Sequence, residues 1–117
     1  MIDVLKKSLL FKGMKSEEIE DYLSFAKASV KKYKRGESVF IAGDYATELY
    51  ILLSGEIAVE NITLSGKKTI VNVFDKPGTV FAEVYLYIDE PLHHSASATK
   101  DSSLLAIKKE YILEQNY

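Results

Sequence analysis

The spacing of hydrophobic residues changes once along this chain, near residue 30. Before that point, one set of apolar residues recurs every three or four positions, as on one face of a helix: Ile19, Tyr22, Leu23, Ala26 and Val30. Ser16 lies where an N-cap is expected, and the glutamates that follow it suit the positive end of a helix dipole. A shorter apolar repeat in residues 2–9 predicts one or two more helical turns. The sequence therefore predicts helices at the N-terminus, the main one running from Ser16 to about residue 28.

Beyond residue 30 the chain consists of short apolar runs separated by turns that contain glycine. We expect two short strands between residues 30 and 41, followed by longer ones at 48–54, 56–63, 68–74, 95–99 and 103–107. Residues 68–74 carry apolar side chains on both faces, which favours a strand between two layers. Residues 108–115 have the pattern of the start of a helix. Many short strands joined by tight turns predict a mainly β fold of the sandwich or roll type.

Composition supports one folded domain and narrows its function. The chain has 117 residues, 47% hydrophobic and 27% charged, which is typical of a single globular domain covering residues 1–117. It contains no cysteine, so disulfides and thiolate metal sites are excluded. The N-terminus lacks a signal-peptide core and no apolar run could span a membrane, so we expect a cytoplasmic protein with no membrane partner. A net charge of −2 argues against nucleic-acid binding by this segment itself.

The stretch from residue 76 to residue 99, KPGTVFAEVYLYIDEPLHHSASAT, has the least ordinary pattern in the chain. It begins with a Pro77-Gly78 turn, continues with an apolar run around one acid, Glu83, and ends with alternating small residues. A carboxylate in an apolar segment is costly to bury unless a partner or a ligand binds it. Periodicity alone also allows a simpler explanation, in which Glu83 lies at the surface of a short helix.

The order of these elements resembles the phosphate-binding cassette of the cyclic-nucleotide-binding domain superfamily, in particular the effector domain of Crp/Fnr-type bacterial transcription regulators. The turn at Arg35-Gly36-Glu37 and the stretch LYILLSGEI at 49–57 resemble the same family. The resemblance implies a double-stranded β-roll of jelly-roll type, with flanking N-terminal helices and the start of a C-terminal helix. It also implies a dimerisation helix and a DNA-binding domain beyond residue 117, and a homodimer in the full-length protein.

In that family the cassette binds its ligand through three groups. Backbone N–H groups of a short helix face the cyclic phosphate, a glutamate accepts a hydrogen bond from the ribose 2′-hydroxyl, and an arginine supplies positive charge. By resemblance, Glu83 is the glutamate, Ala82 replaces the preceding glycine, and Leu92 occupies the arginine position. The candidate effector-binding residues are Ala82, Glu83, Val84, Tyr85, Leu92, His93, His94 and Ser95.

Leu92 can offer a phosphate neither a charge nor a hydrogen bond. Loss of one partner from a buried charge pair costs about 2–5 kcal/mol, which corresponds to roughly thirty-fold to a few thousand-fold in affinity. We therefore predict that the domain does not bind cAMP or cGMP at useful strength, and that it senses an unknown small molecule or has lost its ligand. Binding would be relayed to the C-terminal helix as a population shift. The alternative is a cAMP- or cGMP-binding regulatory module of a signalling protein.

The two adjacent histidines allow further interpretations. A protonated His93 or His94 could replace the arginine, although a surface histidine beside one packed at a strand edge is the simpler interpretation. Neighbouring strand residues point to opposite faces, so the pair cannot easily hold one metal ion, and two histidines are too few for a three-histidine cupin site. We expect no metal and no cofactor; haem held by one histidine has no other support in the sequence. No nucleophile, base and orienting group can be assembled, which argues against an enzyme. A cupin-like enzyme that shares the β-roll is a second alternative, which metal analysis of the purified protein would separate from a sensor.

Overall fold

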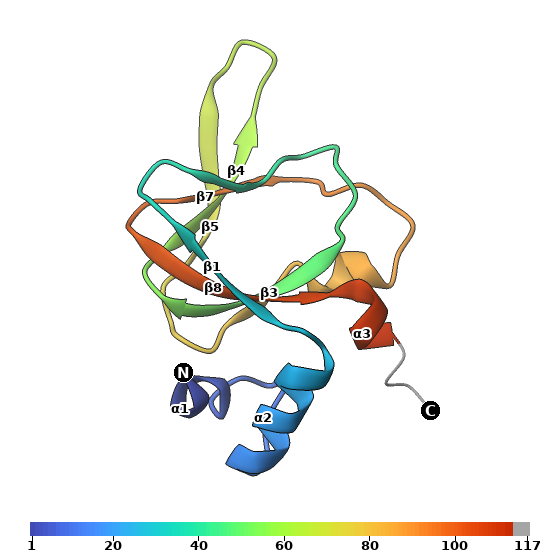
Figure 1. Cartoon of the computed structure of the whole chain (residues 1–117). Coiled ribbons are helices and arrows are strands. Elements are labelled where there is room, and N and C mark those ends of the chain that lie inside the picture. Colours follow the sequence, from blue (N-terminus) through green and yellow to red (C-terminus); the bar gives the residue numbers. More distant parts are fainter. Residues whose placement is uncertain (114–117) are drawn as a thin grey trace.

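The computed structural model describes residues 1–113, which form two four-stranded antiparallel sheets arranged as a roll (Figure 1). The first sheet has the strand order β1 (Ser29–Tyr33), β8 (Ser102–Lys108), β3 (Glu48–Ser54) and β6 (Val80–Phe81). The second has the order β2 (Ser38–Phe40), β7 (Ser95–Ala98), β4 (Ile57–Ile62) and β5 (Lys68–Phe74). This architecture confirms the predicted mainly β roll, and the two-residue strand β6 is an element that the sequence did not predict.

The helices lie outside the roll, as Figure 1 shows. Near the N-terminus are α1 (Ile2–Leu5) and α2 (Ser16–Phe25), and α3 (Lys109–Leu113) follows β8 without a break. A short 3-10 helix, η1 (Glu83–Leu86), lies in the segment that connects β6 to β7. The helix predicted at residues 108–115 begins at Lys109 in the structure, and the part of that prediction beyond residue 113 lies outside the described residues.

The main helix begins and ends differently from the prediction. The N-cap is Lys15 rather than Ser16, because Ser16 is already the first helical residue and the Glu18 carboxylate accepts a hydrogen bond from the Lys15 N–H at 3.0 Å. The helix ends at Phe25 and is closed by Lys27, which has a left-handed backbone with φ of 51°. This closure is a C-terminal capping turn of the kind usually made by glycine.

The core has two parts because β3 and β8 are buried on both faces. Alternate residues of these strands point to opposite sides, so Leu49 and Ile51 pack against the helices while Tyr50 and Leu52 point into the roll. The outer part of the core includes Leu5, Phe11 and Ile19 from the helical segment. The inner part is completed by residues from both sheets, among them Ile57, Phe81, Ala96, Ala98, Leu104 and Ala106.

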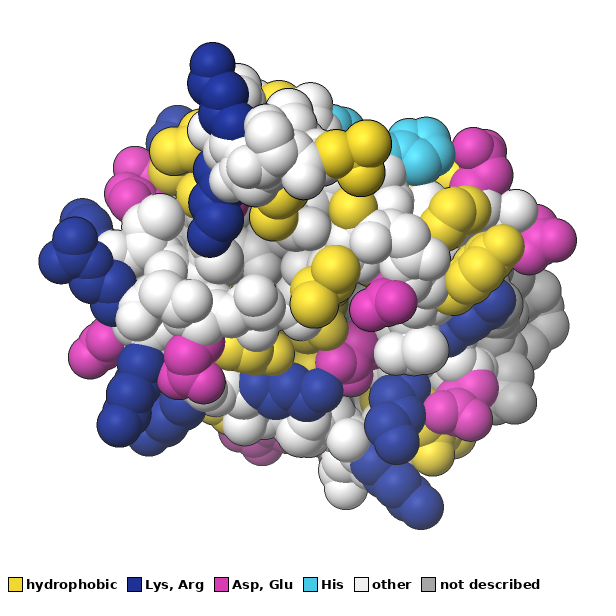
Figure 2. Space-filling model, turned by 90° about the horizontal axis from the view of Figure 1, so that it is seen from above, with side chains coloured by type: hydrophobic (Ala, Val, Ile, Leu, Met, Phe, Trp, Pro, Cys, Tyr) yellow, Lys and Arg dark blue, Asp and Glu magenta, His cyan; other side chains and the backbone are white. Residues whose placement is uncertain are grey.

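The prediction that residues 68–74 form a strand between two layers is wrong. It is β5, an edge strand of the second sheet, and its residues from Lys68 to Val73 are exposed. With β4 it forms a hairpin that projects beyond the roll in Figure 1, and Figure 2 shows hydrophobic side chains at the surface of that end of the molecule. The exposed apolar residues of the hairpin are Ile62, Leu64, Ile70, Val71 and Val73.

Candidate functional site

Ala82 joins β6 to η1 and has a left-handed backbone, with φ of 67°. Such a conformation costs a non-glycine residue about 1–2 kcal/mol, because the Cβ approaches the following carbonyl oxygen. The turn is held on both sides: Phe81 pairs with Tyr50 of β3, and the Tyr85 N–H donates to the Ala82 carbonyl at 3.3 Å. The fold therefore requires at this position the conformation that glycine adopts most easily, and glycine is the residue that the cassette resemblance implies there.

Two adjoining cavities at the aromatic interior of the roll form what we call the inner site. The acidic cavity, of about 180 Å³, is lined by residues that include Phe40, Asp44, Tyr45, Glu48, Tyr50 and Leu92. The aromatic cavity, of about 140 Å³, is lined by residues that include Phe40, Phe74, Phe81, Tyr85, Leu92 and His94. Three residues, Phe40, Ala82 and Leu92, line both cavities and so lie between them. Small-molecule sites usually measure about 300–1,000 Å³, so a ligand of ordinary size would occupy both.

Four aromatic rings form a continuous column along the inner site. Phe40 stacks on Tyr50 with centroids 6.2 Å apart, Tyr50 stacks on Phe81 at 5.5 Å, and Phe81 stacks on Phe74 at 5.1 Å. These rings come from four different strands, β2, β3, β6 and β5, which are brought together only by the closure of the roll. They give the site a rigid apolar wall that favours flat or hydrophobic ligand groups.

Glu48 is the buried acid of the inner site. Only 8% of its surface is exposed, and its Oε1 atom accepts hydrogen bonds from Lys31 Nζ at 2.6 Å and from the Tyr50 hydroxyl at 2.9 Å. Among the described residues, none donates to its other oxygen, Oε2. Burial raises the pKa of Tyr50 far above its usual value, and the negative charge of Glu48 and the hydrogen bond to it act in the same direction. Tyr50 is therefore a neutral donor throughout the physiological pH range.

Leu92 is buried, with 4% of its surface exposed, and is fixed by its backbone. Its N–H donates to the Asp44 carbonyl at 2.8 Å, and its carbonyl accepts from the Gly43 N–H at 2.9 Å. These two bonds attach the end of the cassette to the loop before β3. An apolar side chain consequently fills the position that the resemblance assigns to the arginine.

The other polar residues of the cassette point in different directions. His94 lines the aromatic cavity, whereas His93 is exposed, with Nε2 3.2 Å from a Glu90 carboxylate oxygen and its ring edge-on to Tyr85. Ser95 is buried, and its hydroxyl accepts a hydrogen bond from the Ala42 N–H at 2.9 Å. The two histidines therefore lie in different surroundings, and no three metal-ligating side chains cluster anywhere in residues 1–113.

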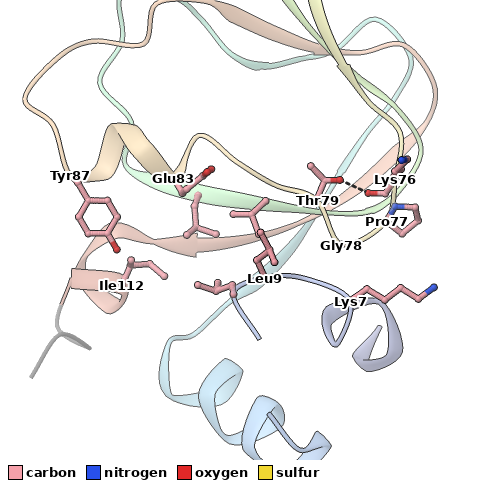
Figure 3. A pocket seen from close by; sticks show the side chains of 12 residues that line it. Lys7, Leu9, Lys76, Pro77, Gly78, Thr79, Glu83, Tyr87 and Ile112 are labelled. Atoms are coloured by element: carbon pink, nitrogen blue, oxygen red, sulfur yellow. Dashed lines mark hydrogen bonds between the residues drawn. The ribbon is translucent and has the colours of Figure 1, made fainter. Parts of the chain in front are cut away.

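Glu83 does not line either cavity of the inner site. It is exposed on η1 and borders a larger outer pocket of about 600 Å³ between the cassette, the N-terminal segment and α3. Figure 3 shows Tyr87 and Ile112 at one end of this pocket and Lys7 and Lys76 at the other. Val84 is also exposed, at 55%. The simpler explanation for Glu83, a surface glutamate on a short helix, describes its position in the structure.

Of the residues selected from the sequence, the structure thus gathers four around the inner site: Ala82, Tyr85, Leu92 and His94. The sequence analysis missed Phe40, Asp44, Glu48 and Tyr50, which line the same site from outside the cassette. One signal was available for Glu48, because it stands directly before the strongly apolar run LYILL. The argument about buried carboxylates that singled out Glu83 applies better to Glu48.

The structure thus combines a small β-roll with a short helix, η1, whose Tyr85 lines one of the two cavities of the inner site. The chain matches the family described as "Cyclic nucleotide-binding domain" over residues 30–115, and it belongs to that family. Its relatives are Crp-type transcription regulators. The family comprises regulatory domains rather than enzymes, which confirms the prediction that the chain is not an enzyme.

Among curated relatives, the chain is 31% identical over 106 residues to the "Cyclic AMP receptor protein" of Thermus thermophilus, covering 91% of this chain and 48% of that protein. It is 26% identical over 83 residues to the "HTH-type transcriptional regulator ArcR" of Staphylococcus epidermidis, covering 71% and 36%. The chain therefore spans about half the length, or less, of the curated relatives that it matches.

Solved structures show the same fold. The sensor domain of the transcriptional regulator DNR from Pseudomonas aeruginosa has a TM-score of 0.82 at 24% identity, covering 97% of this chain and 74% of that one. The catabolite activator protein of Thermus thermophilus has a TM-score of 0.76 at 30% identity, covering 90% and 48%. In the described part of this chain, no helix has the length and apolar character needed to cross a membrane.

Proposed function

We propose that this chain is the effector-sensing domain of a Crp-type transcription regulator, and that its effector is a small molecule other than a cyclic nucleotide. The observation that carries this proposal is the buried Leu92, which lines both cavities. By the cassette resemblance, this is the position at which the family's arginine meets a cyclic phosphate. A phosphate there would gain no countercharge from Leu92, and would lie near the carboxylates of Asp44 and Glu48 instead. DNA binding, dimerisation and a cytoplasmic location would belong to the full-length protein, with DNA contacted by a domain outside these residues.

The hydrogen-bond pattern supports a route from the site to the C-terminal helix. Thr47 lines the acidic cavity, and its carbonyl accepts a hydrogen bond at 2.9 Å from the N–H of Lys109, the first residue of α3. A ligand that displaces the Thr47–Glu48 segment would therefore act on the start of α3. Such a coupling biases an equilibrium between two arrangements and requires no chemistry.

Calorimetric titration of the purified domain with cAMP and with cGMP tests the proposal directly. We expect no binding in the micromolar range for either nucleotide. A micromolar dissociation constant would favour the second candidate, a cAMP-responsive domain, which the name of the Thermus thermophilus relative suggests.

A pair of double variants tests whether the cassette has been aligned correctly. Leu92→Arg combined with Ala82→Gly is expected to increase affinity for cyclic nucleotides about thirty-fold, near the lower limit for a buried charge pair, because Asp44 and Glu48 compete for the new guanidinium. The matched control, Leu92→Met with Ala82→Gly, restores the glycine without the charge. No gain in the first variant relative to the control would place the arginine position elsewhere.

A further inference from the structure

The charges around the inner site are unevenly distributed. Asp44 and Glu48 both line the acidic cavity, and no lysine or arginine is among the described residues that line either cavity. The ammonium group of Lys31 donates to Glu48 Oε1 at 2.6 Å. Because that ion pair neutralises one carboxylate, the exposed Asp44 leaves the cavity with an excess of negative charge. This electrostatic environment disfavours an anionic ligand and favours a cationic one.

The aromatic residues of the acidic cavity are a second, independent reason to expect a cationic ligand. The acidic cavity is lined by three aromatic side chains, those of Phe40, Tyr45 and Tyr50. Aromatic faces attract organic cations through their quadrupole, and the combination of rings with carboxylates is a common way to recognise an ammonium group. Tyr50 is stacked between Phe40 and Phe81, so the rings left to contact a cation are those of Phe40 and Tyr45. Glu48 also retains Oε2 as an acceptor, since both of its hydrogen bonds from described residues are made to Oε1.

The aromatic cavity is suited to the other end of such a ligand. Its lining is almost entirely apolar and includes the rings of Phe74, Phe81 and Tyr85, with His94 at its border. Phe40, Ala82 and Leu92 are shared with the acidic cavity, so one ligand could place a ring in the first space and an amine in the second.

Resting on the function proposed above, we infer that the effector of the inner site is an organic amine with an aromatic or apolar body. Its ammonium group is held in the acidic cavity by Glu48 and Asp44, beside the rings of Phe40 and Tyr45. Its apolar body packs in the aromatic cavity beside Phe81. The substitution of leucine for the family's arginine is then one half of a reversal of charge preference, of which the two carboxylates are the other half.

Three probes of equal length but different charge test the inference: 2-phenylethylamine, 2-phenylethanol and phenylacetate. Each is titrated into the isotope-labelled domain, and binding is followed by amide chemical shifts of residues that line the inner site. The amine is expected to bind at least about tenfold more tightly than phenylacetate, with the alcohol between them, since a charge-assisted hydrogen bond is involved. Equal or tighter binding of phenylacetate, or no binding of the amine at tens of millimolar, would overturn the inference.

Substitutions of Asp44 and Glu48 test whether these two carboxylates bind the ammonium group. Asp44→Asn and Glu48→Gln should each weaken amine binding several-fold and leave 2-phenylethanol binding unchanged. Asp44 is exposed, so its variant keeps the test valid if loss of the Lys31–Glu48 pair impairs folding. Asp21→Asn, which removes one charge from α2, is the control and should have no effect.

A cAMP titration in the same series separates the two proposals. Tight cAMP binding would overturn both the proposed function and the inference. Weak cAMP binding without a preference for the amine would overturn only the inference.

Discussion

Two non-glycine residues among those described, Ala82 and Lys27, have left-handed backbones. Ala82 lies at the inner site, whereas Lys27 closes α2 on the outside of the roll. The left-handed backbone carries the same conformational cost at both residues. It allows the cassette to turn at Ala82 and ends a helix at Lys27. The same substitution made at both positions therefore separates the effect of backbone strain from the effect of lying at the inner site.

Replacement by glycine should stabilise the domain at both positions. The relief of about 1–2 kcal/mol is partly offset by about 0.4–1 kcal/mol from the greater freedom of glycine in the unfolded chain. We therefore expect Ala82→Gly and Lys27→Gly each to raise the free energy of unfolding by up to about 1 kcal/mol in urea titrations. A gain at Lys27 without one at Ala82 would mean that the cassette turn relaxes in solution.

Tyr50 links the buried site to the pH dependence of stability. Its pKa is raised in the folded protein, first by burial and then by the charge of Glu48, while the unfolded chain loses the proton near pH 10. The contribution of Tyr50 to the free energy of unfolding is therefore complete below pH 10. Above pH 10 this contribution falls by up to about 1.4 kcal/mol per pH unit.

The variant Tyr50→Phe isolates this contribution. Unfolding free energies measured between pH 8 and pH 11 should fall less steeply above pH 10 in the variant than in the parent protein. Tyr22 and Tyr33, whose pKa values burial also raises, remain in both proteins and cancel in the comparison. Equal slopes would show that Tyr50 ionises without unfolding.

At the scale of the elements, the corner between β3 and β4 is packed closely against the turn between β7 and β8. Gly55 has a φ of 95°, and a Cβ added there would lie 2.6 Å from the Asp101 carbonyl oxygen. Gly66, in the turn between β4 and β5, has a similar φ of 85° but open space around it. The two glycines share a conformational requirement and differ in packing.

Alanine substitution at the two turns should therefore give different losses. Gly66→Ala is expected to cost about 1–2 kcal/mol from backbone strain alone. Gly55→Ala should cost about 1–3 kcal/mol more, because the corner must also move away from the β7–β8 turn. Thermal or urea unfolding of both variants measures the difference, and similar losses would mean that the corner yields easily.

The bounds of most strands were predictable, but their neighbours were not. The segments at 48–54 and 68–74 were predicted with the bounds that β3 and β5 have in the structure. Only β3, however, is covered on both faces, while β5 is an exposed edge. The hydrophobic pattern indicates which faces of a strand are apolar, and it cannot show whether another element lies against them.

At the scale of the whole molecule, the same limit explains the partial prediction of the site. The cassette residues Ala82 and Leu92 are close in sequence and could be selected together. Glu48 and Phe40 join them only because β2, β3 and β7 are brought together by the roll, with the loop carbonyl of Asp44 bonded to Leu92. Glu83, selected for its place in an apolar run, lies instead on the outer surface, since the 3-10 helix exposes one side of that run.

The central position of β8 has a consequence for experiments on this domain. It is paired with β1 on one side and β3 on the other, and its residues from Leu104 to Ile107 are almost inaccessible to solvent. Backbone protons of this strand should therefore exchange with deuterated water only through global opening, while outward-facing amides of the β5 edge exchange early. A compound that binds inside the roll would raise the free energy of global opening, by an amount that grows with its concentration relative to its dissociation constant, and would slow exchange of the β8 protons accordingly. Deuterium uptake at this one strand could thus report on an unknown effector without an assay of DNA binding.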